Sequence, residues 1–262
     1  MTGTRLRATP MRVMGIVNAT PDSFWAKSRF ETLERAVSAG RQMFDSGAWA
    51  VDIGGESTRP DADPVSVAEE LARVIPVVAE LVRFGVASVD TRHAEVAEAA
   101  VDAGARIVND VSGKLYEVAG RLGVGYVSMH SHTVPVVAGV YPSYGDVCTD
   151  ITAFVTDTAH AAVDSGASRV WVDPGIGFGK SPADNVRLLR HLPQLCGGPF
   201  PVLLGASRKS FLGAVTGRDV DNRLAASLAV IGPAWSAGVD VIRVHDVPET
   251  IDTIAMLNTI WG

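Results

Sequence analysis

The chain has 262 residues, of which 47% are hydrophobic and 20% are charged, so it can bury a full core and is not a disordered chain. Its net charge of -6 and pI near 5.5 argue against a basic face for nucleic acid or an anionic membrane. We therefore expect no nucleic-acid or membrane partner, and we expect any anionic ligand to be held by a few local cations.

The first residues of the chain and its two cysteines indicate the cellular compartment in which the protein is expected. Met1 to Pro10 lacks the apolar centre of a signal peptide, and no run reaches the ~20 apolar residues of a membrane helix. Cys148 and Cys196 are far apart and have no metal-type spacing, so free thiols in a reducing compartment are expected. A cytoplasmic protein is the prediction.

Short aliphatic runs alternate with helical patterns along the whole chain. Val13–Asn18 reads as a strand and leads to a helical pattern over Leu33–Phe44; Ala50–Gly54 leads to a helix that starts at Ser66, which forms a capping box with Glu69. Further strands are predicted at 86–90, 107–110, 125–130, 170–173, 202–205 and 241–245, and helices at 96–103, around 118, at 151–163, from 181, from 212, at 224–236 and at 251–257.

These elements form eight strand–helix units of about 30 residues, with no low-complexity linker between them. An α/β fold is therefore expected, as a single (β/α)8 TIM barrel in one domain over residues 1–262. An open, doubly wound sheet is the alternative with the same alternation.

Polar side chains gather where the predicted strands end. One such residue could cap a helix, but a ring of them is hard to explain that way, because charges near the core are costly without partners. In a barrel this rim is where active sites are built. The residues are Asn18, Asp52, Asp90, Asn109, His130, Asp173, Ser207, Lys209, Arg243 and His245.

The residue types on this rim describe a ligand. Asp90, Asn109 and Asp173 supply acceptors and an amide, which suit the hydrogen-bonding edge of a flat heterocycle. Positive charge for an anionic leaving group comes from other strand ends, and one further amide could hold a metal or phosphate oxygen. The cationic residues are Lys209, Arg243 and His245, and the amide is Asn18.

Two stretches leave alternatives open. Ser207-Arg208-Lys209-Ser210 follows a buried strand and is either a solvated basic turn or one wall of the site. The run Gly175–Lys180 has the glycine density of a nucleotide loop but lacks the Walker and dinucleotide spacings, so turn glycines are the better interpretation. No Ser-His-Asp pattern of a hydrolase is present.

Seven blocks in order along nearly the whole chain resemble the signature of the dihydropteroate synthase family. They are Met14–Phe24, Asp52–Pro60, Ser88–Thr91, Asn109–Gly113, Asp173–Lys180, Ser207–Phe211 and Arg243–Asp246. The resemblance implies a folate-pathway transferase that joins 6-hydroxymethyl-7,8-dihydropterin diphosphate to 4-aminobenzoate and releases diphosphate. It also implies a dissociative mechanism, in which diphosphate leaves before the aryl amine attacks the resulting cation.

The resemblance also implies roles for individual residues. A pterin-binding group, a diphosphate group with Mg²⁺ as counter-ion, and an aminobenzoate group are expected. The pterin residues are Asp90, Asn109, Met129, Asp173, Gly205 and Lys209; the diphosphate residues are Asn18, Arg243 and His245, with Asn18 also at the metal; the aminobenzoate residues are Phe24, Thr58, Arg59, Pro60, Phe178, Ser207 and Arg208.

The sequence departs from the family pattern in two loops. Trp25–Arg29 stands where a Ser-Asp-Gly-Gly type of run is usual, and His130–Thr133 replaces a Met-His-Met-Arg-Gly type. Our hypothesis is that pterin diphosphate binding is intact while aminobenzoate or sulfonamide recognition is altered; neutral drift of a loop is the alternative. A pterin-binding paralogue without synthase activity and a pterin-dependent methyltransferase are the competing functions.

The remaining aromatic residues are expected to serve packing. The histidines away from the rim, His93, His132, His160 and His191, are interpreted as exposed or packing side chains, because no cluster has zinc spacing. Trp49, Trp171 and Trp235 are interpreted as core or subunit-interface residues. The apolar faces of the late helices, including Ala229, Ile231 and Trp235, make a homodimer the expected assembly.

Overall fold

A computed structural model describes residues 10–19, 26–56, 64–134, 136–137 and 139–262, and gives only the backbone for 26–32. Eight parallel strands stand side by side in the order β6-β5-β4-β3-β2-β1-β8-β7. The strands are β1 (Arg12–Asn18), β2 (Ala50–Gly54), β3 (Val86–Asp90), β4 (Ile107–Asp110), β5 (Gly125–Met129), β6 (Arg169–Asp173), β7 (Leu203–Gly205) and β8 (Val241–Val244).

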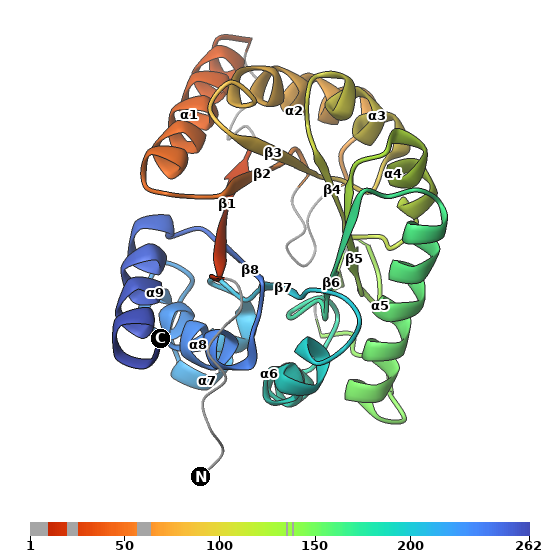
Figure 1. Ribbon diagram of the computed structural model, residues 1–262. Helices are drawn as coiled ribbons and strands as arrows, with labels where there is room; N and C mark the ends of the chain where they lie inside the picture. Colours follow the sequence, from red (N-terminus) through yellow and green to blue (C-terminus); the bar gives the residue numbers. More distant parts are fainter. Residues whose placement is uncertain (1–9, 20–25, 57–63, 135, 138) are drawn as a thin grey trace.

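The sheet curls into a ring, and the helices lie around its outside (Figure 1). The two end strands meet through one parallel bridge between Val172 and Val202, and the Val172 amide donates to the Pro201 carbonyl at 3.0 Å. The expected (β/α)8 barrel is confirmed, and the open sheet is excluded. In the described residues the helices are α1 (Ala26–Asp45), α2 (Val67–Leu81), α3 (Ala94–Asp102), α4 (Tyr116–Leu122), α5 (Val147–Asp164), α6 (Pro182–Cys196), α7 (Ser210–Thr216), α8 (Leu224–Ala237) and α9 (Val247–Trp261).

Two predicted helix starts are confirmed by their hydrogen bonds. The Ser66 hydroxyl accepts from the Glu69 amide at 3.3 Å, and the Ser181 hydroxyl accepts from the Asp184 amide at 3.1 Å. α1 begins at Ala26, earlier than the Leu33 expected from apolar spacing alone. None of the helices, within the described residues, is long and apolar enough to cross a membrane.

The core has two layers that fix where a site can form. Most buried apolar side chains lie between the strands and the helices, while a smaller group fills the barrel interior toward the amino ends of the strands. Because the lower interior is filled, the carboxyl ends of the strands are left to carry polar groups. The inner group is Met14, Ala50, Ile107, Val127, Trp171, Leu203 and Val241.

Several packing expectations can be judged from burial. Trp171 and Trp235 are buried, and Trp49 packs against the inner group, so core packing is confirmed for all three. Ile231 is also buried within this chain, and with Trp235 it belongs to the core. The interpretation of these two residues as part of a subunit face was therefore wrong, because their side chains are already covered within this chain, Trp235 Nε1 donating to Asn258 Oδ1 on α9 at 2.8 Å; Ala229 is exposed.

Candidate active site at the carboxyl end of the barrel

The predicted acceptors meet on one rim. Asp90 and Asp173 are the last residues of β3 and β6, and Asn109 is the next to last of β4. The register pairs Asp90 with Asn109, which sets these two side chains next to each other. Asn109 and Asp173 are buried. Strand geometry therefore brings together residues that are far apart in the chain.

Arg243 ties this group together from β8. Its Nε donates to Asp52 Oδ2 at 2.6 Å, and its Nη2 donates to Asp90 Oδ2 at 2.6 Å. Asn109 Nδ2 donates to the same Asp52 oxygen at 2.8 Å. Asp52 is fully buried and was absent from the predicted site groups, although it was noted among the strand-end polar residues. It sets the direction in which the Asn109 amide and the Arg243 guanidinium point.

The protonation of this group is shifted by its surroundings. Burial raises the pKa of Asp90 to about 7, with Arg243 opposing and Asp52 adding to the rise. Burial alone would lower the pKa of Arg243, but Asp52 and Asp90 outweigh it and the pKa is raised. A carboxyl group that titrates near neutrality on a barrel rim is a feature of functional sites.

Lys209 and Asp173 form the second half of the pocket. A β-carbon added at Gly205 would lie 3.7 Å from Lys209 Nζ and 3.8 Å from Asp173 Oδ2, so Gly205 lies between the two and leaves room there. Burial lowers the pKa of Lys209 to about 8, with Asp173 opposing, and burial raises the pKa of Asp173, with Lys209 opposing. Lys209 Nζ also donates to the Ile176 carbonyl.

An apolar wall stands beside these charges. Lys209 Nζ lies 4.3 Å from the centroid of the Phe178 ring, close enough for a cation–π contact. Phe178 and Met129 are buried in one small cluster with Val111 and Val136. A flat ring bound between the Asp and Lys side chains would therefore have apolar neighbours on one side.

Ser207 and His245 face each other across β7 and β8. The Ser207 hydroxyl accepts from the His245 amide at 3.3 Å and lies 3.0 Å from His245 Nδ1. Burial, and then Arg243, lowers the pKa of His245 to about 4, so the imidazole is neutral near pH 7. A hydroxyl that accepts from the amide can donate to Nδ1, which leaves the ring hydrogen on Nε2.

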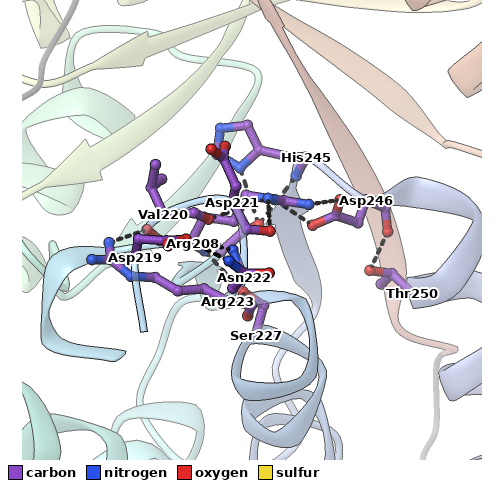
Figure 2. A network of polar contacts seen from close by, with 11 residues as sticks. Arg208, Asp219, Val220, Asp221, Asn222, Arg223, Ser227, His245, Asp246 and Thr250 are labelled. Atoms are coloured by element: carbon purple, nitrogen blue, oxygen red, sulfur yellow. Dashed lines mark hydrogen bonds and ion pairs between the residues drawn. The ribbon is translucent and has the colours of Figure 1, made fainter. Parts of the chain in front are cut away.

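The Arg208 side chain is engaged by Asp246 and by the loop before α8, as Figure 2 shows. Its guanidinium makes a two-pronged pair with Asp246, at 2.7 and 2.9 Å, and its amide donates to the Ser227 hydroxyl at 2.9 Å. Its backbone is left-handed, with φ 56. The interpretation of residues 207–210 as a solvated turn is wrong, because Ser207 is buried and both cations are engaged by partners.

Several predicted site residues cannot be placed. Phe24, Thr58, Arg59 and Pro60, all predicted for aminobenzoate, lie outside the described residues, and so does Trp25 of the altered first loop. Ala26–Arg29 begin α1, with their side chains undescribed. Asn18 ends β1 on the same rim, and its side chain is exposed.

The loop after β6 explains the glycine-rich run. Gly175, Gly177 and Gly179 all have left-handed backbone, with φ +67, +83 and +64. A β-carbon at Gly175 would lie 1.9 Å from the His130 carbonyl oxygen. The run is therefore needed for close backbone approach, as the turn interpretation held, and Lys180 at its end is buried.

One further cluster lies beside the rim. Among the described residues, Glu56, Glu70 and His93 have possible ligand atoms within 4.8 Å of one another. Their spacing along the chain gave no sign of this. His93 Nδ1 lies 2.6 Å from Glu70 Oε2, and Arg92 holds both oxygens of Glu56, at 2.7 and 2.9 Å. The Glu56 carboxylate is thus already neutralised by an arginine.

Comparison with known proteins agrees with this geometry. A family profile described as "Pterin binding enzyme" matches residues 14–245. A dihydropteroate synthase of Synechocystis is 38% identical over 260 residues, which is 95% of this chain and 90% of the relative. The chain belongs to the dihydropteroate synthase family. A Xanthomonas albilineans dihydropteroate synthase solved with 4-aminobenzoic acid matches with a TM-score of 0.87 and 44% identity, covering 96% of this chain and 93% of that one.

Other members of the family are longer. A Haloferax volcanii relative, a probable bifunctional folylpolyglutamate synthase/dihydropteroate synthase, is 41% identical over 249 residues, which is 92% of this chain but 30% of the relative. The chain thus spans about a third of that relative and nearly all of the Synechocystis one. Among the described residues, Asp52, Asp110 and Lys180 are buried charged side chains that lie in the family-like sequence blocks and were given no role there.

Proposed function

We propose that this chain is a dihydropteroate synthase: it condenses 6-hydroxymethyl-7,8-dihydropterin diphosphate with 4-aminobenzoate to 7,8-dihydropteroate and diphosphate, as a single domain over residues 1–262. The observation that carries the proposal is the convergence of Asp90, Asn109, Asp173 and Lys209 on one rim, beside Arg243 and His245. Because the chain belongs to the dihydropteroate synthase family, we assign these side chains to the binding of pterin and diphosphate.

The pterin end follows from the hydrogen-bonding groups. A pterin edge offers adjacent N–H donors and ring acceptors, which match two carboxylates, one amide and one ammonium. Asp173 and Lys209 lie about Gly205, where the missing side chain leaves space. Asp52, through its bond to Asn109 Nδ2, leaves the Asn109 carbonyl oxygen as the amide group that can accept from the ring.

The diphosphate end follows from His245 and its neighbours. A neutral His245 with its hydrogen on Nε2 donates one hydrogen bond to a phosphate oxygen without adding a charge next to Arg243. Arg243 remains a cation because of Asp52 and Asp90. Both groups stabilise the charge that develops as the bond between the pterin methylene carbon and diphosphate breaks.

Magnesium fits this end through oxygen ligands. Mg²⁺ prefers oxygen ligands and keeps several waters when it also binds phosphates, and the exposed amide of Asn18 on the rim offers one such oxygen. When bound, the ion would neutralise diphosphate charge. The Glu56–Glu70–His93 group is a poorer match, because it includes an imidazole and its Glu56 is already held by Arg92.

The second substrate has to attack after diphosphate departs, and water has to be kept from the pterin cation. Phe178 and Met129 give this side of the pocket an apolar wall. A role of Ser207 at the aminobenzoate is a proposal from the family resemblance, and it would require the Ser207 hydroxyl to give up its hydrogen bond to His245 Nδ1. The roles of Phe24, Thr58, Arg59 and Pro60 remain proposals from the family resemblance, as does the role of Arg208, whose side chain is engaged by Asp246.

A coupled diphosphate-release assay tests the function. We expect release that depends on 4-aminobenzoate and is matched by dihydropteroate formation. Release without condensed product would instead identify a pterin-binding paralogue. Methyl transfer to or from a pterin, with no diphosphate release, would identify a methyltransferase and overturn the proposal.

The altered first loop is a separate proposal about specificity. We propose weaker recognition of aminobenzoate and sulfonamides, since an alanine, Ala26, stands where the family usually has an acid. Steady-state kinetics of wild type and Ala26→Asp test it: the substitution should lower the KM for aminobenzoate and leave that for pterin diphosphate unchanged. An ordinary aminobenzoate KM and ordinary sulfonamide inhibition, unchanged by Ala26→Asp, would show neutral drift.

A homodimer and a cytoplasmic location are also proposed. The dimer has support from three exposed apolar side chains on the last helix, Met256, Ile260 and Trp261, which are 58%, 57% and 60% exposed. Light scattering at micromolar concentration should give twice the chain mass of 27.5 kDa, and a single-chain mass would contradict the dimer.

A further inference from the structure

Lys180 ends in a buried amino group with three backbone partners, and burial lowers its pKa to about 7, with Asp173 opposing. Its Nζ donates to the carbonyl oxygens of Gly175 at 2.8 Å, His130 at 3.0 Å and Phe178 at 3.3 Å, and the residue is 3% exposed. An ammonium has three hydrogens, so all of its donors are used by the protein. The partners come from two segments, the end of β5 and the loop after β6, which Lys180 holds together.

The loop that Lys180 holds carries three groups of the proposed pterin pocket. The Gly175 amide donates to Asp173 Oδ1 at 2.7 Å, the Ile176 carbonyl accepts from Lys209, and the Phe178 ring lies under the Lys209 ammonium. Each of these groups is within one residue or two of a carbonyl bound by Lys180. A shift of the loop would move all three.

The loop backbone needs hydrogen-bond donors at this point. The left-handed turns of the three glycines bring the Gly175 and Phe178 carbonyls and the His130 carbonyl to one place. Three converging carbonyl dipoles are unfavourable in a buried site unless positive charge or donors lie between them. Asn185 holds the loop from the other side, since its Oδ1 accepts from the Gly177 amide at 2.7 Å, but its bonds do not reach β5.

We propose that Lys180 is a positioning residue for pterin recognition: by clamping the loop after β6 onto the end of β5, it fixes Asp173, the Ile176 carbonyl and Phe178 around Lys209. The inference rests on the proposed synthase function, and it assigns a role to a residue outside the proposed pterin and diphosphate groups, whose amino group is bound to backbone carbonyls.

The test measures pterin affinity directly. Calorimetric titration of Lys180→Met with 6-hydroxymethylpterin, well below the melting temperature, should show affinity at least on the order of tenfold weaker than wild type, because displacing a binding group by about 1 Å can cost ~100-fold. Affinity for inorganic diphosphate should stay within about twofold, since in the described part of the chain Arg243 is held by Asp52 and Asp90 and His245 by Ser207. Lys180→Gln keeps two N–H donors, so its pterin affinity should lie between those of wild type and Lys180→Met. This variant replaces Lys180→Met in the test if the methionine variant does not fold.

Tyr126→Phe is the matched control for lost stability. Tyr126 is fully buried and its hydroxyl donates to Asp110 Oδ2 at 2.9 Å, on the helix-facing side of the barrel. The variant should melt earlier yet bind 6-hydroxymethylpterin as wild type does. Unchanged pterin affinity in a folded Lys180 variant, or an equal loss in Tyr126→Phe, would overturn the inference. A wild type that binds the pterin but forms no dihydropteroate would overturn the proposed function alone.

Discussion

Charged side chains have different surroundings at the two ends of the barrel. At the amino end, Arg12 lies 4.0 Å over the Trp49 ring and pairs with Asp240, while Trp171 Nε1 donates to Asp240 Oδ2 at 2.8 Å. The rings of Trp49 and Trp171 are 5.8 Å apart. Arg12 and Asp240 are thus covered by aromatic rings and by each other, above the apolar side chains that fill this end of the barrel.

At the carboxyl end, burial displaces the protonation equilibria. The pKa of Asp90 is raised to about 7, and those of Lys209 and His245 are lowered to about 8 and about 4, each mainly by burial. Such shifts mean that the fold holds these groups at a cost in stability. The same strands therefore stabilise the barrel at one end and carry the binding groups at the other.

The largest expected effect comes from removing the site cation. Lys209→Ala should lower kcat/KM for pterin diphosphate by on the order of 10³-fold, because Asp173 loses its opposite charge and the ring loses a donor. Melting should change little by comparison. Steady-state kinetics check this, with Lys114→Ala, an exposed lysine, as control. A loss of kcat/KM of tenfold or less would contradict the proposed role of Lys209 in pterin binding.

The amino end should give the reverse result. Trp171→Ala should cost about 3 kcal/mol of unfolding free energy, because the ring fills the barrel interior and its N–H satisfies Asp240. Urea unfolding measures this loss. For the protein that remains folded, kcat/KM should stay within about twofold; a larger fall would mean that the two ends are coupled.

Acid should act through the carboxyl end. The pKa of His245 is lowered from 6.5 to about 4, so below pH 6.5 the unfolded chain binds a proton that the folded chain does not, and stability falls as pH drops toward 4. The difference corresponds to ~3 kcal/mol at most. The pKa of Asp90 is raised from 3.8 to about 7, so its contribution to stability changes in the opposite direction over this whole range, and the effect of His245 has to be measured as a difference between variants.

His245→Asn isolates this contribution. The fall in unfolding free energy between pH 6.5 and 4 should be smaller in His245→Asn than in wild type, while His160→Asn, at an exposed position, should behave as wild type does. Parallel stability curves for all three proteins would contradict the assignment of a neutral, half-buried His245.

The smallest effect is expected at the boundary of the site. Arg208→Ala should cost about 1–2 kcal/mol of unfolding free energy, because it removes a two-pronged pair with partly buried Asp246. Its loss of kcat/KM should be well below that of Lys209→Ala, since the guanidinium is already held by Asp246. Equal losses in the two variants would place Arg208 among the binding groups.

Much of the architecture could be predicted because it depends on local rules. The alternation of aliphatic runs and helical patterns predicted the barrel, and Ser66 and Ser181 marked helix starts through hydrogen bonds that span three residues. The start of α1 at Ala26 was missed, since no apolar spacing marks it. The dimer interpretation failed for Ile231 and Trp235 because an apolar helix face looks the same whether it meets the barrel or another subunit.

The sequence by itself determined the strands, the polar residues at their ends and the family to which the chain belongs. Each of these features depends on residues that are close together in the sequence. Only the tertiary structure decided which charges meet: Arg243 with Asp52 and Asp90, Arg208 with Asp246, and Lys180 with three carbonyls. These contacts join residues on different strands and loops. Their geometry depends on barrel closure, which brings strand ends together that no sequence spacing relates.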